Sequence, residues 1–219
     1  MNEPATDTLA SALERHQIEL PAEHMAKLQE YVQRLWAWNE KLNLTRHTDY
    51  EKFVARDLRD TLELSKLLHP EEEVLDVGTG GGVPGVVLAI IRPDLRVTLC
   101  ESVGKKAQAV QEMVQGLGLP VPLYHCRAEE LFEDFRFDAA VARAVGPLYK
   151  LCNWFQDHWA SIGRLLAIKG PSWAEERHEA RHKGLLNNLN LRVAASYPMP
   201  GTHSESVILK LWPKGAPEK

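Results

Sequence analysis

The chain has 219 residues with a formal net charge of −4, and 44% of its residues are apolar. This length suits one large domain with a substantial core. No apolar run approaches the roughly 20 residues that span a membrane, and the N-terminal segment does not resemble a signal peptide. The negative charge argues against a general nucleic-acid-binding protein, which usually has a basic domain, but it does not exclude a local basic patch.

The three cysteines are Cys100, Cys126 and Cys152, and they form no CxxC pair. An odd number at wide spacing argues against a disulfide framework and favours the reducing cytoplasm. We interpret all three as small buried thiols.

The first third of the chain has only helical periodicity. Helices are predicted at residues 7–16, from about 21 to 41, and at 50–68. In the second of these, apolar residues recur at spacings of three and four, beginning with Met25, Leu28 and Val32. We expect residues 1–70 to form a helical cap on a second domain, residues 71–219.

From residue 73 onward, short apolar strands alternate with helices. Strands are predicted at 73–77, 96–100, 121–126, 137–142 and 164–168. Helical segments are predicted at 83–91, 104–116, 129–132 and 148–161. A capping box from Ser172 to Glu175 predicts a further basic helix, ending near Asn187. This α/β alternation predicts a Rossmann-like, mostly parallel sheet with helices on both faces. Two final strands, 191–196 and 206–211, predict an antiparallel hairpin at one edge.

The segment LDVGTGGGVPG, residues 75–85, joins the first strand to the helix that follows it. In open α/β sheets, ligands bind beyond the carboxyl ends of the strands. The segment contains a GxGxxG pattern that begins at Gly80, and Glu101 ends the second strand. Taken alone, this pattern is the fingerprint of a dinucleotide site.

Three features favour S-adenosylmethionine over a dinucleotide. Asp76 precedes the first glycine, where its carboxylate can face an ammonium group. Gly78 and Gly80 complete a D-x-G-x-G-x-G pattern, which is typical of S-adenosylmethionine sites. Pro84 removes an amide donor that a pyrophosphate would use. We therefore expect a nucleoside with a cationic amino-acid tail, and Glu101 is expected to accept hydrogen bonds from the ribose hydroxyls.

Later strands end in further candidate residues. After the third strand, the backbone amide of Ala128 or Glu129 is placed to read the edge of the adenine. Arg143 ends the fourth strand and Lys169 ends the fifth. A strand end beside the cofactor is where a substrate group is held. The alternative for Arg143 is an ordinary ion pair, and a purely structural role is likewise the alternative for Lys169.

Several motifs occur together in a fixed order. They are LNLT at 42–45, VLDVGTGGGVPG at 74–85, ES and GKK within 101–106, RAEEL at 127–131, ARAVGPL at 142–148 and AIKGP at 167–171. From about residue 20 to 211 the chain resembles the RsmG family, also called GidB. The glycine motif is common to many methyltransferases, whereas the whole set is much more diagnostic. The resemblance implies a class I methyltransferase that methylates ring nitrogen 7 of one guanine in bacterial 16S rRNA.

The resemblance also implies which residues form the site. The expected contacts of S-adenosylmethionine are Gly78, Gly80, Val83, Glu101, Ser102, Ala128, Glu129 and Arg143. The substrate is expected to contact Arg143 and Lys169. The expected partner is 16S rRNA in a small ribosomal subunit or an assembly intermediate, because an acidic protein binds free RNA poorly. We expect a cytoplasmic monomer with no metal and no membrane partner.

Two segments depart from the family pattern. Arg56-Asp57 stands where the family usually has Arg-His, and Thr61 stands where it has serine. His203-Ser204-Glu205 stands where the family often has Arg-His. The resemblance therefore transfers no role to these positions.

The expected reaction is an in-line displacement, which depends on orientation and electrostatics. Nitrogen 7 of guanine has a free lone pair at neutral pH, so no general base is expected. A donor on nitrogen 7 would block the attack, although arginine commonly contacts both nitrogen 7 and oxygen 6 of guanine. Arg143 or Lys169 is therefore expected to reach oxygen 6 or a flanking phosphate.

Three other functions stay open. One is a methyltransferase acting on another RNA or on a small molecule, and another is a non-catalytic ribosome-assembly factor with a vestigial pocket. The third is a nicotinamide-dependent dehydrogenase. The intact Asp76, Gly78, Gly80 and Glu101 argue against a vestigial pocket. The lack of an evident second catalytic domain and of a matched acid and base argues against a dehydrogenase.

Overall fold

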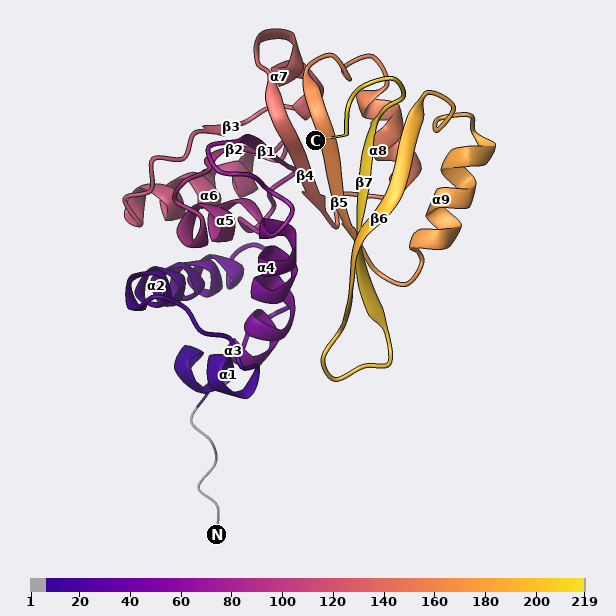
Figure 1. Cartoon of the computed structure of the whole chain (residues 1–219). Coiled ribbons are helices and arrows are strands. Elements are labelled where there is room, and N and C mark those ends of the chain that lie inside the picture. The colour runs from indigo at the N-terminus through magenta and orange to yellow at the C-terminus, as the bar shows by residue number, and fades with distance from the viewer. Residues whose placement is uncertain (1–6, 219) are drawn as a thin grey trace.

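The computed structural model describes residues 7–218 and is built around a seven-stranded sheet with strand order β3-β2-β1-β4-β5-β7-β6 (Figure 1). The strands are β1 (Glu73–Val77), β2 (Arg96–Cys100), β3 (Leu123–Tyr124), β4 (Phe137–Arg143), β5 (Ile162–Lys169), β6 (Leu189–Pro198) and β7 (Glu205–Pro213). Strands β1 to β5 pair in parallel, and β7 is antiparallel to both β5 and β6. The predicted parallel sheet with an antiparallel edge hairpin is confirmed.

The helices before the sheet are α1 (Leu9–Arg15), α2 (Ala22–Asn39), α3 (Tyr50–Lys52), the π-helical turn η1 (Phe53–Leu58) and α4 (Arg59–Ser65). The later helices are α5 (Gly85–Ile91), α6 (Gly104–Gly116), α7 (Ala128–Asp134), α8 (Leu148–Phe155) and α9 (Trp173–His182). Within residues 7–218, no helix combines the length and apolar character that a membrane crossing requires.

The sheet separates two apolar layers, and successive residues of a strand enter opposite layers. In β1, Val74 packs with the N-terminal helices and with α5 and α6. Its neighbour Leu75 packs with α7, α8 and α9. Figure 1 shows this division, with the N-terminal helices beside α5 and α6 and with α8 and α9 across the strands. The central strands are apolar on both faces because both faces are covered.

The N-terminal helices are part of the main core. In α2, Leu28, Tyr31, Val32 and Leu35 follow the predicted spacing, and each is at most 1% exposed. They pack in the same apolar layer as Val86 of α5. We propose that residues 1–70 form a cap and residues 71–219 the sheet domain. At this boundary the sequence changes from helices alone to alternating strands and helices. The apolar core is nevertheless continuous across it.

Several element boundaries differ from the predictions. Helix α5 begins at Gly85, because Val83 and Pro84 lie in the glycine turn. The predicted capping box at Ser172 does not form. Ser172 has φ −75° and ψ 2° instead of the extended backbone of a capping residue, and its hydroxyl donates to Glu176. The predicted helices over 148–161 and to Asn187 end early, at Phe155 and His182, and continue as turns.

The predicted third helix, 50–68, contains a π-helical turn, η1. A π-helical turn has one more residue between hydrogen-bonded groups than an α-helix, and such turns frequently occur at functional sites. Here the turn contains Arg56 and the fully buried Asp57. It therefore changes which residues of this helix face the sheet.

A buried ion pair joins the start of the sheet to β5. Arg164 of β5 is 1% exposed, and its two terminal nitrogens donate to the Glu72 carboxylate at 2.9 and 2.7 Å. The same guanidinium donates to the carbonyl of Leu67, which follows α4. The pair thus connects the cap, the first strand and the centre of the sheet.

We predict that Glu72→Ala lowers the free energy of unfolding by about 3–5 kcal/mol, because it leaves the buried Arg164 guanidinium without its counter-ion. Glu73→Ala is the matched control. Glu73 pairs at 3.1 Å with Arg96, and both side chains are well exposed, so its loss should cost less than about 1 kcal/mol. Urea denaturation measures both, and equal losses would contradict the prediction.

Candidate active site

A cleft of about 370 Å³ lies at the carboxyl ends of β1, β2 and β4. Its wall combines residues that follow these strands with residues of the N-terminal cap. The strand-end residues are Gly78, Thr79, Gly80, Gly81, Val83, Glu101, Ser102, Arg143, Ala144 and Val145, and the cap contributes Leu35, Leu44 and Thr45. This is the edge of the sheet at which the sequence predicts a ligand.

The glycine turn forms the floor of this cleft. Gly80 has φ +60°, a conformation that glycine adopts without strain. Gly85 is required for close packing, since an added Cβ would lie 2.3 Å from Leu99 Cδ2 and 2.6 Å from Asp76 Oδ2. The turn is also held from the cap, because the Tyr31 hydroxyl donates to the Gly81 carbonyl at 2.8 Å.

Asp76 was predicted to face the ligand, but its side chain does not line the cleft. Its side chain is fully buried, and Oδ2 accepts a hydrogen bond from the Gly85 amide at 2.8 Å. Burial raises the pKa of Asp76 to about 6, although the hydrogen bond from the Gly85 amide opposes the shift. The carboxylate therefore stabilises the start of α5 from beneath the turn, and the structure does not place it against a ligand's ammonium group.

Glu101 lies at the cleft wall with its carboxylate fixed by backbone amides. Oε2 accepts from the Gly80 amide at 2.9 Å, and Oε1 accepts from the Val103 amide at 2.8 Å. A carboxylate has about four acceptor sites, so each oxygen keeps capacity for a further donor. The residue is thus both a brace for the glycine turn and an oriented acceptor at the end of β2.

A second hollow, of about 240 Å³, adjoins the first and shares Gly78, Ser102, Val145 and Trp154 with it. Its other lining residues are Val77, Cys100, Cys126, Arg127, Ala128 and Glu129. Together the two hollows bring into one cleft all the residues predicted for the cofactor. The lining of the second is more apolar, which suits a flat aromatic base.

Arg143 lies where the cleft meets the cap. One terminal nitrogen donates to Asp57 Oδ1 at 2.6 Å, and the other donates to Asp60 Oδ2 at 3.2 Å. Burial alone would lower the pKa of Arg143, but the two carboxylates outweigh it and raise the pKa. The ion pair considered as an alternative for Arg143 is present, and it joins the end of β4 to the cap helix.

Two further groups complete this network. His47 Nδ1 lies 2.9 Å from Asp57 Oδ1, the oxygen that Arg143 also contacts. The Tyr197 hydroxyl donates to Asp60 Oδ1 at 2.8 Å. Asp57 occupies the position at which the family usually has histidine, and the His47 imidazole contacts it from the loop after LNLT.

A wider pocket, of about 670 Å³, opens on the other side of Arg143 and Ala144. Its charged lining residues are His47, Arg56, Asp60, Arg143, Lys169 and Glu176. Lys169 is 8% exposed, and its ammonium group contacts Glu176 at 2.8 Å and the Gly146 carbonyl. Arg143 therefore lies between the two pockets, and Lys169 lines only the wider one.

Several lining residues were missed from the sequence. Leu44 and Thr45 belong to the LNLT motif, which served only to identify the family, yet both line the first cleft. Trp154 belongs to none of the motifs, but it lines both cofactor hollows. Arg56 matches the arginine of the family's Arg-His pair, but the broken pattern transferred no role to it, and its place in the wider pocket depends on the π-helical turn.

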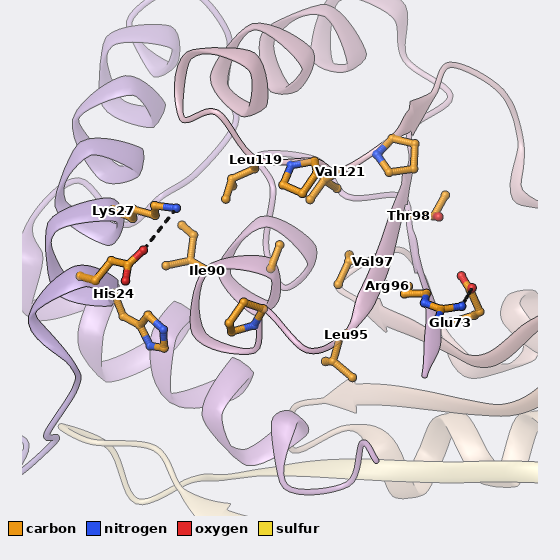
Figure 2. Close-up of a pocket in the computed structure, with 15 residues that line it drawn as sticks. His24, Lys27, Glu73, Ile90, Leu95, Arg96, Val97, Thr98, Leu119 and Val121 are labelled. Carbon is orange, nitrogen blue, oxygen red and sulfur yellow. Dashed lines mark hydrogen bonds and ion pairs between the residues drawn. The ribbon is translucent and has the colours of Figure 1, made fainter. Parts of the chain in front are cut away.

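Another cavity of about 370 Å³ lies away from this site (Figure 2). It includes Glu73 and Arg96, the first residues of β1 and β2, so it lies at the amino ends of these strands. Apolar side chains such as Ile90, Leu95 and Val97 line most of it. It shares none of the residues predicted for the cofactor or substrate. Within the described part of the chain, no cluster of three or more acidic, histidine or cysteine side chains is suited to a metal.

Residues 24–197 match the protein family described as GidB: rRNA small subunit methyltransferase G. The chain belongs to this family. A GidB-family relative from Rhodopirellula baltica, named Ribosomal RNA small subunit methyltransferase G, is 55% identical over 189 residues, or 86% of this chain and 82% of the relative. A relative of the same name from Halorhodospira halophila is 41% identical over 172 residues, or 78% and 81%. The predicted family is confirmed.

Solved structures share the fold of this GidB-family chain at low sequence identity. A mutant of MtNAS in complex with S-adenosylmethionine has a TM-score of 0.55 at 17% identity, covering 95% of this chain and 86% of that one. The 23S rRNA methyltransferase ErmE has a TM-score of 0.53 at 17% identity, covering 74% and 70%. These similarities confirm the class I methyltransferase fold.

The buried Asp76 carboxyl predicts a specific pH dependence of stability. Its pKa rises from 3.8 to about 6 on folding, so the folded state holds the proton longer than the unfolded state. The free energy of unfolding therefore falls as pH rises from 4 to 6, by about 3 kcal/mol from this group. Asp76→Asn should remove this decline, so that its own contribution to the free energy of unfolding no longer changes with pH. Thermal unfolding of both proteins between pH 4 and 7 measures it, and parallel curves would contradict it.

Proposed function

We propose that this rRNA small subunit methyltransferase transfers a methyl group from S-adenosylmethionine to ring nitrogen 7 of one guanine in 16S rRNA. The observation that carries the proposal is the arrangement of two adjoining pockets on either side of Arg143 and Ala144. One contains the residues expected at the cofactor, and the other is open, charged and large enough for a base.

The residues of the first cleft fit S-adenosylmethionine. We propose that Glu101 accepts hydrogen bonds from the ribose hydroxyls, since its carboxylate is already oriented by the Gly80 and Val103 amides. The adenine is proposed to lie in the hollow that contains Ala128 and Glu129. The amino-acid tail then extends over Gly78 and Gly80, beside Val83 and Ser102.

The bound cofactor supplies a methyl group on a positively charged sulfur. In the proposed transfer, the lone pair of guanine nitrogen 7 would form the new carbon–nitrogen bond, and the electron pair of the broken carbon–sulfur bond would stay on sulfur. The positive charge moves to the guanine ring and no proton is released, so no general base is needed. The protein's contribution is to align the two groups and exclude water.

The target base is proposed to enter the wider pocket beside Arg143 and Lys169. Both cations are held by carboxylates, Arg143 by Asp57 and Asp60 and Lys169 by Glu176. Each retains hydrogen-bond donors that can reach oxygen 6 of guanine or a flanking phosphate. A base must leave its stack to be reached in this way, so a loop presented by a small ribosomal subunit or an assembly intermediate suits the pocket. That the enzyme works as a cytoplasmic monomer stays a prediction.

The proposal predicts the modification pattern of 16S rRNA in cells. A strain lacking the gene should lose 7-methylguanosine at one site, and the wild-type gene should restore it. Glu101→Ala should fail to restore it while the protein still accumulates, because the ribose acceptor and the brace of the glycine turn are both lost. Glu112→Ala, an exposed change on α6, serves as the control and should restore the modification fully. Mass spectrometry of the nucleosides measures all four strains, and an unchanged map would refute the rRNA guanine as substrate.

The strand-end cations are predicted to orient the base. Arg143→Ala and Lys169→Ala should each reduce turnover at least about tenfold, as expected for the loss of one positioning contact worth about 1.4 kcal/mol. Transfer of a labelled methyl group to small subunits from the deletion strain measures the rates. If both variants keep full turnover, neither residue orients the guanine.

A further inference from the structure

Buried polar atoms without partners are rare in folded proteins, and each needs an explanation. The cap helix beside the cleft contains three of them: Arg56 NH1, Asp57 Oδ2 and Arg59 Nε. None of these atoms makes a hydrogen bond with the protein within residues 7–218. Of the two arginines, only Arg56 lines the wide pocket beside Arg143 and Lys169.

The cationic side chains of this pocket differ in whether a carboxylate is paired with them. Arg143 and Lys169 both contact carboxylates at 3.2 Å or less. The guanidinium group of Arg56 has no carboxylate partner among the described residues, although it lies one residue from Asp57 and four from Asp60. A guanidinium has five donors and no acceptor, so its natural partner is an oxygen atom with a lone pair.

The backbone explains why Arg56 lies at the pocket. It belongs to η1, the π-helical turn from Phe53 to Leu58. The same turn buries Asp57, which anchors Arg143 and His47. Phe53, Val54 and Leu58 of the turn are completely buried, so the helix is held firmly against the core. Arg56 is thus presented from a rigid element that is itself fixed to the end of β4.

We propose that Arg56 is an RNA-binding residue that donates hydrogen bonds to an acceptor oxygen of the target nucleotide. This inference rests on the proposed function. The acceptor is oxygen 6 of the guanine or an oxygen of an adjacent phosphate. Nitrogen 7 is excluded, because a donor there would occupy the lone pair that attacks the methyl group. Arg143, held between Asp57 and Asp60, then fixes the cap helix that carries Arg56.

The test is steady-state methyl transfer from labelled S-adenosylmethionine to small ribosomal subunits of a strain that lacks the gene. Arg56→Ala should lower kcat/KM for the subunits at least about tenfold, the equivalent of one lost charged contact. The Kd for S-adenosylmethionine, measured by calorimetry, should stay within about twofold, because Arg56 does not line either cofactor hollow. A purely structural role would change both quantities together.

Lys52→Ala is the matched control. It removes a cation from the same helical segment, but Lys52 is exposed, pairs with Asp49 at 2.6 Å and lies outside the pocket. Its kcat/KM should equal that of the wild type. An equal loss in Lys52→Ala and Arg56→Ala would overturn the proposal in favour of a general effect of charge.

The salt dependence distinguishes the two acceptors. If Arg56 contacts a phosphate, Arg56→Lys should recover much of the activity, and Arg56→Ala should reduce the slope of log KM against log salt concentration by about one. If Arg56 contacts oxygen 6, Arg56→Lys should also recover activity, since lysine donates to guanine as well, but the slope should not change. Either pattern supports the proposal.

Undiminished kcat/KM of Arg56→Ala at every salt concentration would overturn the role of Arg56 and leave the proposed function intact. Absence of transfer by the wild-type protein to any ribosomal subunit preparation would instead overturn the proposed function, and with it the role of Arg56. The two failures are therefore distinguishable from the wild-type reaction alone.

Discussion

The candidate site depends on the contacts of one buried group, the carboxylate of Asp57. Its Oδ1 atom accepts from the Arg143 guanidinium at 2.6 Å and lies 2.9 Å from the His47 ring. These groups come from the cap helix, the end of β4 and the loop after LNLT. Removing one partner of the buried Asp57–Arg143 pair would cost about 3–5 kcal/mol, because the other charge would be left buried without its counter-ion. The shape of the cleft follows from that attachment.

The same attachment extends to the rest of the molecule. Asp60, one turn after Asp57, accepts from Arg143 and from the Tyr197 hydroxyl of β6. Burial and then the Asp60 carboxylate raise the pKa of Tyr197 above its usual value, which is consistent with a protonated hydroxyl that donates to Asp60. From the opposite side, Tyr31 of α2 holds the glycine turn. The cap therefore completes a cleft that the sheet alone would leave open.

The sequence predicted the parts of the site that follow from sheet topology. Glu101, Arg143 and Lys169 each end a parallel strand, and parallel strands bring their carboxyl ends to one edge of the sheet. The contributions of the cap were not predictable in this way. The spacing of apolar residues does not reveal a π-helical turn, so the sequence could not predict where the side chains of Arg56 and Asp57 lie. Asp76 was expected to face the ligand because it precedes the first glycine of the motif. Its carboxylate instead accepts a hydrogen bond from the Gly85 amide.

A crystal structure with S-adenosylhomocysteine bound would test the site most directly. We expect both ribose hydroxyls within hydrogen-bonding distance of Glu101, the adenine beside the amides of Ala128 and Glu129, and the sulfur toward Ala144, where the two pockets meet. Ligand bound in the cavity at the amino ends of β1 and β2, or with its sulfur turned away from the wider pocket, would contradict the proposed arrangement.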